Sequence, residues 1–454
     1  MGSLFSFLTV TYYLPKLFFA EAPAAVTVRR SLGSKELEQV SLRSFVQSRC
    51  TSLLQPFRPA WWLPTGHLQT AYCVVGDFSQ IDKVEYDRTL LRTLDGGTIG
   101  LDFTPPTAED TYPPDTPVIV VLHGLTGGSH ESYVRSILAP ACTPVEKGGL
   151  GYRAVVMNFR GCAGVPMTSP QLYSGGHTDD IRVSLMYIAK KYPQAPLHGI
   201  GFSLGANVLT RYLAQEGEHS RLSSGCVLGC PWNLLANSNE LENRWLLREV
   251  YSRAMAQNLT RLLQRHVTDL SKFPDSDFAK AAQTLFTLKK PTLMEFDNTA
   301  TRVGGGSSPP FPFDSAHDYY VWASSHDLLP DVRVPLLAMN ADDDPIVQKL
   351  PIDEGVKALS PWVVFALTNG GGHLGWFERG SRWHHPKRWV SKPVLEWMRA
   401  VGRDFVPDTG KTKPINEVDG FLKEEGRDDI GCKEVEHGEH IIGVEGEEGM
   451  LAGL

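Results

Sequence analysis

Short apolar segments alternate with amphipathic segments through the middle of the chain, and this alternation predicts the fold. The apolar segments have the length of strands, and the segments between them repeat their apolar positions at helical spacing. Strands are predicted at residues 117–122, 153–158, 197–202, 225–230, 334–340 and 362–367. Helices are predicted at residues 132–141, 180–191, 206–215, 348–359 and 394–401.

Strands that are apolar along their whole length are buried on both faces. The alternation therefore predicts an α/β fold, with a mostly parallel sheet and helices on both of its faces. Residues 84–94 and 98–103 flank Asp95-Gly96-Gly97, a hairpin signal that predicts an antiparallel edge. Ligands of such sheets bind at the carboxyl ends of the strands.

The alternation stops between residues 231 and 330. Apolar side chains there recur at helical spacing and form one stripe along a helix or a helix pair: Leu241, Trp245, Tyr251, Met255, Leu259 and Leu262. Such a stripe is compatible with an ordinary core. Because the segment follows a strand of the predicted site, we expect a helical cap with an apolar lining at about 231–330.

The two ends of the chain differ from this middle part. Residues 1–20 are apolar and aromatic but are interrupted by Pro15 and Lys16, which is marginal for a membrane-spanning helix. We expect weak membrane association there, with a frayed terminus as the alternative, and the first residues also fit the pattern for N-myristoylation at Gly2.

Residues 57–70 are rich in proline and tryptophan and predict an irregular arm wrapped on the domain. Residues 409–454 are acidic and rich in glycine and contain almost no aromatic residues, which predicts a disordered tail. The α/β domain is therefore expected to span residues 57–408.

Charge and cysteine content restrict the partners and the location. The net charge of −7 comes from the tail after residue 410, which has twelve acidic and five basic side chains, so the rest of the chain is neutral. A neutral body argues against nucleic acid as a partner. Seven cysteines without a Cys-x-x-Cys pair argue against a disulfide framework or a zinc site. We expect an intracellular protein, cytoplasmic or peripheral to an internal membrane.

The candidate nucleophile is Ser203. An apolar strand ends in Gly201-Phe202-Ser203-Leu204-Gly205 and continues directly into a predicted helix. In this strand–turn–helix context Gly-x-Ser-x-Gly places the serine on a sharp, exposed turn. The pentapeptide also arises by chance in glycine-rich chains. Ser203 is therefore a nucleophile only if the chain also supplies a base and an acid for it.

A serine hydroxyl needs a base to accept its proton and an acid to orient that base. The strand at 334–340 is followed by Asp342-Asp343-Asp344, and the strand at 362–367 by a glycine-rich loop around His373. Taken alone, the three aspartates are compatible with a solvated acidic turn, and His373 is compatible with a surface histidine. Ser203, Asp344 and His373 occur in the order expected for a triad, each after its own strand.

Two backbone N–H groups must also bind the negative charge that develops on the substrate oxygen. The residue after the nucleophile, Leu204, supplies one, and the loop at residues 123–128 supplies the other at Leu125. Each donor contributes about 2.7 to 4 kcal/mol to lowering the barrier.

The chain resembles the α/β-hydrolase superfamily, and within it the subfamily of the yeast medium-chain fatty acid ethyl ester synthase/esterases, the bacterial YheT-like hydrolases and the mammalian abhydrolase-domain proteins 1 to 3. The resemblance is carried by Pro64–Thr70, Leu122–Ser129, Asn158–Cys162, Gly201–Gly205, Asp343–Pro345 and Gly371–Gly375. It implies a triad of Ser203, Asp344 and His373, with Asp343 as the alternative acid.

The resemblance implies acyl transfer through a serine-bound intermediate, to water in ester hydrolysis or to a small alcohol in ester synthesis. An apolar cap suits a medium-chain acyl ester or acyl-CoA, and no cofactor or metal is expected. The apolar residues 1–20 support an alternative hypothesis, a phospholipase or monoacylglycerol lipase that acts at a membrane. A receptor that binds an acyl ligand without turnover is the third hypothesis, and the intact set of catalytic groups argues against it.

Overall fold

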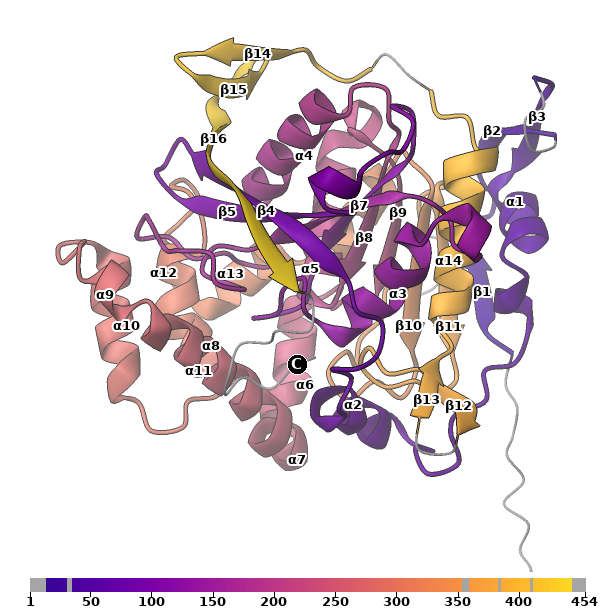
Figure 1. Ribbon diagram of the computed structural model, residues 1–454. Coiled ribbons are helices and arrows are strands. Elements are labelled where there is room, and N and C mark those ends of the chain that lie inside the picture. Colours follow the sequence, from indigo (N-terminus) through magenta and orange to yellow (C-terminus); the bar gives the residue numbers. More distant parts are fainter. Residues whose placement is uncertain (1–13, 31–34, 353–358, 383–384, 409–410, 443–454) are drawn as a thin grey trace, which may run out of the picture.

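The computed structural model describes residues 14–30, 35–352, 359–382, 385–408 and 411–442. Its centre is a twelve-stranded sheet in the order β1-β11-β10-β9-β8-β6-β7-β5-β4-β16-β15-β14 (Figure 1). The strands from β11 to β7 in this order are mutually parallel. They are β6 (Val118–Leu122), β7 (Arg153–Asn158), β8 (Leu197–Phe202), β9 (Leu222–Leu228), β10 (Leu336–Ala341) and β11 (Val363–Thr368).

Antiparallel strands extend both sides of this parallel core. They are β1 (Lys16–Phe19), β4 (Glu85–Thr93), β5 (Thr98–Thr104), β14 (Ile415–Val418), β15 (Phe421–Glu424) and β16 (Arg427–Ile442). Two separate hairpins consist of β2 (Ala25–Arg29) with β3 (Leu37–Ser41), and β12 (Phe377–Arg382) with β13 (His385–Arg388).

Helices cover both faces of the sheet because alternate strand residues point to opposite sides. Val118, Val120 and Leu122 of β6 pack in the same core as α4 (Asp179–Lys191) and α5 (Leu204–Glu216). Ile119 and Val121 pack with α1 (Leu42–Arg49), α3 (Ser132–Cys142) and α14 (Ser391–Arg399). The predicted α/β class with helices on both faces is confirmed.

Most predicted strands and helices agree with the structure to within a few residues, and the hairpin around Asp95-Gly96-Gly97 forms as β4 and β5. The helix predicted at 348–359 is wrong for residues 348–352, which are not helical; residues 353–358 lie outside the described residues. The N–H groups of Gln348 and Lys349 donate to the side chain of Asn237 instead of starting a helix.

The irregular arm predicted at 57–70 is also partly wrong, because residues from 66 onward form the helix α2 (Gly66–Val75). Thr65 precedes it as the N-cap, and its hydroxyl accepts the N–H of Leu68. Shorter helical segments are η1 (Thr51–Leu54), η2 (Thr107–Glu109), η3 (Val145–Lys147), η4 (Gly217–His219) and η9 (Ala400–Asp404).

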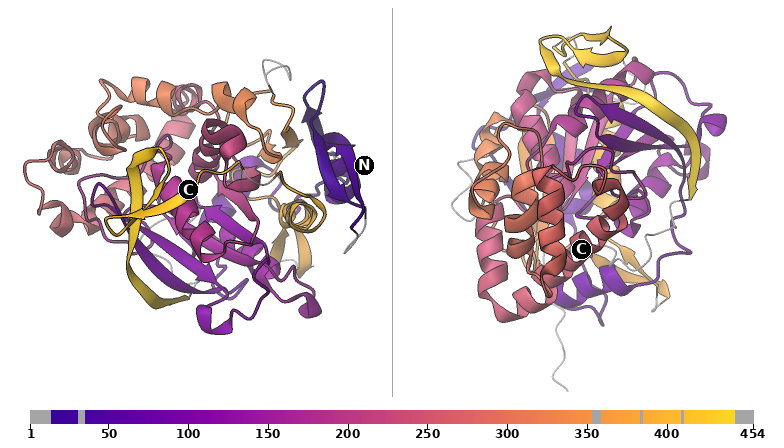
Figure 2. Two further views of the ribbon diagram at one scale, coloured as in Figure 1. Left: turned by 90° about the horizontal axis from the view of Figure 1, so that it is seen from above. Right: turned by 90° about the vertical axis from the view of Figure 1, so that its left-hand side faces the viewer.

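The segment between β9 and β10 is helical and lies to one side of the sheet (Figures 1 and 2). It contains α6 (Leu234–Asn243), α7 (Trp245–Leu247), η5 (Arg248–Ser252), α8 (Arg253–Arg265), α9 (Val267–Leu270), α10 (Asp277–Thr287), α11 (Leu293–Phe296), η6 (Asp297–Thr301), α12 (Arg302–Gly304), α13 (Ala316–Ala323) and η7 (His326–Asp331).

The apolar N-terminal segment has a structural role that the sequence did not indicate. Lys16–Phe19 is β1, which pairs antiparallel with β11 at the edge of the sheet, and Phe19 is buried. Residues 1–13, with the proposed myristoylation site at Gly2, lie outside the described residues. Within the described ranges, every helix is too short or too polar to cross a membrane.

The disorder predicted for residues 409–454 is wrong for 415–442, which form β14, β15 and β16. The last of these pairs with β4 from Cys432 opposite Thr93 to Ile442 opposite Glu85. Main-chain pairing needs little apolar content, and basic partners offset part of the acidic charge. Arg221 and Arg427 both form ion pairs with Glu424, at 2.8 and 2.7 Å.

The packing of this C-terminal hairpin can be tested with Leu422. Its side chain is buried against the main core, whereas Val418 on the neighbouring strand is 43% exposed. We expect Leu422→Ala to lower the free energy of unfolding by about 2 kcal/mol because it leaves a cavity, and Val418→Ala to change it little. Urea unfolding followed by tryptophan fluorescence measures both, and equal stability of the two variants would contradict the packing.

Candidate active site

Ser203 occupies the tight turn between β8 and α5. Its backbone angles, φ 49° and ψ −119°, lie outside the regions that side-chain-bearing residues usually adopt. A Cβ on Gly201 would lie 2.6 Å from Cα of Ala206, and one on Gly205 would lie 2.4 Å from the carbonyl oxygen of His123. Only glycine fits at either position, so the Gly-x-Ser-x-Gly pattern is a steric requirement of this turn.

The structure brings Ser203, His373 and Asp344 into one hydrogen-bonded chain. Nε2 of His373 lies 2.7 Å from Oγ of Ser203, and Nδ1 of His373 lies 2.8 Å from Oδ2 of Asp344. His373 and Asp344 are each 1% exposed. With the Nδ1 proton facing the buried carboxylate, Nε2 faces the serine hydroxyl as a candidate acceptor of its proton.

The two neighbouring aspartates have different partners. The Oδ1 atom of Asp344 accepts the N–H groups of Ile346 and Val347, at 2.8 and 3.0 Å. Asp343 does not reach the imidazole, and its Oδ1 accepts the N–H of Gly372 at 2.9 Å. Burial raises the pKa of the Asp343 carboxyl. The geometry therefore favours Asp344 over Asp343 as the acid.

Helix α2 contacts both the loop that contains Asp343 and Asp344 and the loop that contains His373. Our interpretation of residues 57–70 as an irregular arm missed this role. The hydroxyl of Thr70 accepts the N–H of His373 at 2.8 Å and donates to the carbonyl of Gly66. A Cβ on Gly66 would lie 1.8 Å from the carbonyl oxygen of Asp343. The Thr65 cap signal preceding Gly66 was the available indication of a helix here.

The predicted oxyanion loop is held from both sides of Leu125. The N–H of Gly124 donates to the hydroxyl of Tyr133 at 3.0 Å, and that of Thr126 donates to the hydroxyl of Tyr173 at 2.9 Å. Leu204 is the first residue of α5, where N–H groups have no acceptor within the helix. Both leucines line the same pocket as Ser203.

A buried polar network fixes the base of this loop to the sheet. Both carboxylate oxygens of Asp102 bind the guanidinium of Arg88, and one of them also accepts from Ser129 and Asn158. The amide oxygen of Asn158 accepts the N–H of Ser129 in return. The network leaves the loop little freedom to move, as a preorganised oxyanion site requires.

His123, at the start of the loop, is a structural group. Burial lowers its pKa to about 3, so the ring is neutral. Its Nδ1 lies 2.7 Å from the carbonyl of Gly124, and its Nε2 accepts the N–H of Phe159 at 3.2 Å. Both ring nitrogens are occupied, and the ring is therefore not available as a base.

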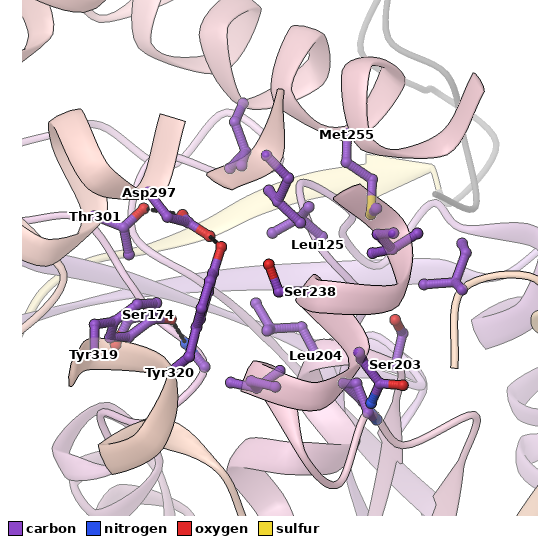
Figure 3. Close-up of a pocket in the computed structure, with 18 of the residues that line it drawn as sticks. Leu125, Ser174, Ser203, Leu204, Ser238, Met255, Asp297, Thr301, Tyr319 and Tyr320 are labelled. Carbon is purple, nitrogen blue, oxygen red and sulfur yellow. Dashed lines mark hydrogen bonds between the residues drawn. The ribbon is translucent and has the colours of Figure 1, made fainter. Parts of the chain in front are cut away.

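The hydroxyl of Ser203 faces a pocket between the sheet and the helical segment (Figure 3). The cavity volume is about 90 Å³. Its lining is mainly apolar and includes Leu125, Leu204, Leu234, Leu241, Met255, Leu259, Leu293 and Ile346.

Asn237 connects this lining to the acid loop and was not singled out from the sequence. Its amide oxygen accepts the N–H groups of Gln348 and Lys349, which follow Asp344 closely in the chain. The residue also lines the pocket. The helical segment therefore helps to position the loop that carries the acid. Within the described residues, His, Cys, Asp and Glu side chains form no cluster suited to a metal ion.

Comparison with known proteins agrees with this architecture. A family model described as the alpha/beta hydrolase fold matches residues 117–379. The chain is 32% identical over 373 residues to a monoacylglycerol lipase of Saccharomyces cerevisiae, covering 74% of this chain and 79% of that protein. It is 29% identical over 423 residues to medium-chain fatty acid ethyl ester synthase/esterase 2 of the same yeast, covering 79% and 89%.

The human protein named phospholipase ABHD3 is 29% identical over 402 residues, covering 87% of this chain and 88% of its own. The matched residues of the family model include the parallel strands, the turn at Ser203 and the helical segment, and they make up more than half of the chain. The chain therefore belongs to the α/β hydrolase fold family.

Proposed function

We propose that this protein is a serine hydrolase of lipid esters that transfers medium-chain acyl groups through an acyl-serine intermediate. The observation that carries the proposal is the hydrogen-bonded chain from Asp344 through His373 to Ser203, whose hydroxyl faces an apolar pocket. A nucleophile, its base and an orienting acid are the groups that acyl transfer needs.

The first half of the reaction forms the acyl-enzyme. Oγ of Ser203 attacks the ester carbonyl carbon while its proton moves to Nε2 of His373, and the N–H groups of Leu125 and Leu204 stabilise the carbonyl oxygen as it becomes negative. Collapse of the tetrahedral intermediate breaks the bond to the alcohol, which leaves with the proton from His373. Asp344 stabilises the imidazolium in between.

The second half depends on the acceptor. Water attacks the acyl-serine in hydrolysis, and a small alcohol attacks it in ester synthesis; in both cases His373 takes the acceptor's proton and returns it to Ser203. The named activities of the relatives support lipid esters as the substrate class, since they include a monoacylglycerol lipase, an ester synthase/esterase and a phospholipase. The apolar pocket supports a fatty acyl chain, from an ester or an acyl-CoA.

Partition of the acyl-enzyme tests the choice of acceptor. The purified protein is incubated with octanoyl-CoA or p-nitrophenyl octanoate, with and without ethanol, and free octanoate is scored against ethyl octanoate. Free acid as the main product supports an esterase, and ethyl ester as the main product supports an alcohol acyltransferase. Monoacylglycerol and phospholipid vesicles, run in parallel, test the lipase and phospholipase alternatives.

The nucleophile is tested with a fluorophosphonate probe. We expect the probe to label Ser203, because an activated hydroxyl reacts faster than other serines, and we expect Ser203→Ala to lower kcat on p-nitrophenyl octanoate about 10⁶-fold. Ser271→Ala, an exposed serine of the helical segment, is the control and should keep full labelling. Labelling that survives in Ser203→Ala would exclude this serine as the nucleophile.

The acid is tested by comparing two neighbouring aspartates. Asp344→Asn removes the carboxylate that fixes the imidazole tautomer, and we expect kcat to fall about 10⁴-fold. Asp343→Asn changes a side chain that holds the N–H of Gly372, and we expect a much smaller loss. Steady-state kinetics on one ester with both variants decides the matter, and a larger loss for Asp343→Asn would reverse the assignment.

A further inference from the structure

The pocket that begins at Ser203 ends at a group of polar side chains. Figure 3 shows Asp297, Thr301, Tyr319, Tyr320 and Ser174 together at the end opposite Ser203. Leu125, Leu204 and the hydroxyl of Ser238 lie between the two ends. An acyl chain attached to Ser203 would thus cross a mainly apolar region before it reaches the polar end.

Asp297 is the central residue of this polar end. Its Oδ2 atom accepts the hydroxyl of Tyr320 at 2.6 Å, and its Oδ1 atom accepts the hydroxyl of Thr301 at 2.5 Å. Asp297 is 6% exposed and lies in the pocket wall. In the described part of the chain no lysine or arginine forms an ion pair with it. Burial raises its pKa to about 6, and each of its two oxygens accepts a hydroxyl, as in an ionised carboxylate.

These contacts leave the carboxylate incompletely bound. An ionised carboxylate has about four acceptor positions, and Tyr320 and Thr301 fill two of them. A buried carboxylate without further donors is costly, and the hydroxyl of Tyr320 would join α13 to η6 equally well if an amide stood in place of the carboxylate. A structural role therefore explains the two hydrogen bonds, but not why an anion stands at the end of an apolar pocket.

We propose that the polar end formed by Asp297, Thr301 and Tyr320 selects the acyl chain, favouring chains that end in a hydrogen-bond donor such as a hydroxyl group. The proposal rests on the proposed acyl transfer at Ser203 and specifies its substrate class. A terminal hydroxyl that reaches Asp297 donates to a free acceptor position. A methyl end of the same length removes water from the carboxylate and gives no bond in return.

The selection therefore depends on chain length. Chains too short to reach the polar end contact only the apolar lining, and a hydroxyl at their end gains nothing. Once the chain reaches Asp297, the hydroxylated substrate is preferred over the methyl-ended one. Hydrogen bonds to charged groups have the strength to make this preference about tenfold in kcat/KM.

The experiment uses p-nitrophenyl esters from hexanoate to dodecanoate, each with a methyl, an ω-hydroxy or an ω-methoxy end. The methoxy end only accepts hydrogen bonds, so it separates donation from general polarity. We expect one range of lengths in which the full-length protein prefers the ω-hydroxy ester over both others about tenfold. Equal kcat/KM for hydroxy and methoxy ends at every length would overturn the proposal.

Two variants locate the effect. Asp297→Asn keeps the shape of the side chain and removes its charge, and should lower the hydroxyl preference, because an amide oxygen accepts a weaker hydrogen bond than a carboxylate oxygen. Asp277→Asn, on an 82% exposed side chain of the same helical segment, is the matched control and should keep the full preference. An undiminished preference in Asp297→Asn would assign it to another group.

Binding separates this proposal from the catalytic one. The free ω-hydroxy and ω-methoxy acids are titrated calorimetrically into Ser203→Ala, which needs no turnover. Tighter binding of the hydroxy acid supports the polar end even if no ester is hydrolysed, and equal binding overturns it. Hydrolysis of methyl-ended esters without any donor preference would leave the acyl transfer at Ser203 standing.

Discussion

The site depends on a backbone conformation that the chain adopts at one residue, the turn at Ser203. The left-handed φ of this serine costs conformational energy, of order 1 to 3 kcal/mol for such residues, and the packing of β8, β6 and α5 around it supplies the compensation. Gly205 lies against the end of β6, where the oxyanion loop begins. The same close contact therefore positions the candidate nucleophile and the loop of the candidate oxyanion donors.

A second layer of contacts fixes the candidate acid, Asp344, and the candidate base, His373. Their loops follow β10 and β11, which are adjacent parallel strands, so both loops leave the same edge of the sheet. Helix α2 packs on the two loops, and its Thr70 binds the backbone of His373. Asn237 binds the chain beyond Asp344 from the other side. The candidate triad is therefore held by elements from the N-terminal part and from the helical segment as well as by its own strands.

Local patterns were enough to predict the parallel strands and the order of Ser203, Asp344 and His373. Apolar segments and glycine-flanked turns can be recognised from neighbouring residues alone, because burial and tight backbone turns restrict which residues occur there. The C-terminal strands were missed because their stability depends on the free edge of β4, a distant partner that composition does not reveal. Asp297 was missed for the same kind of reason, since only folding places this carboxyl in the wall of the pocket that contains Ser203.

The edges of the sheet also bear on how the protein folds during synthesis. β1 pairs with β11, and β4 pairs with β16. Two strands that are synthesised early therefore pair with strands that are synthesised much later. Until then the strand edges that face these late partners are exposed, and unpaired edges favour association with other chains. Pairing between strands so distant in sequence is intrinsically slow. The interval between translation of β4 and of β16 is therefore the period in which a nascent chain of this protein is most vulnerable to aggregation.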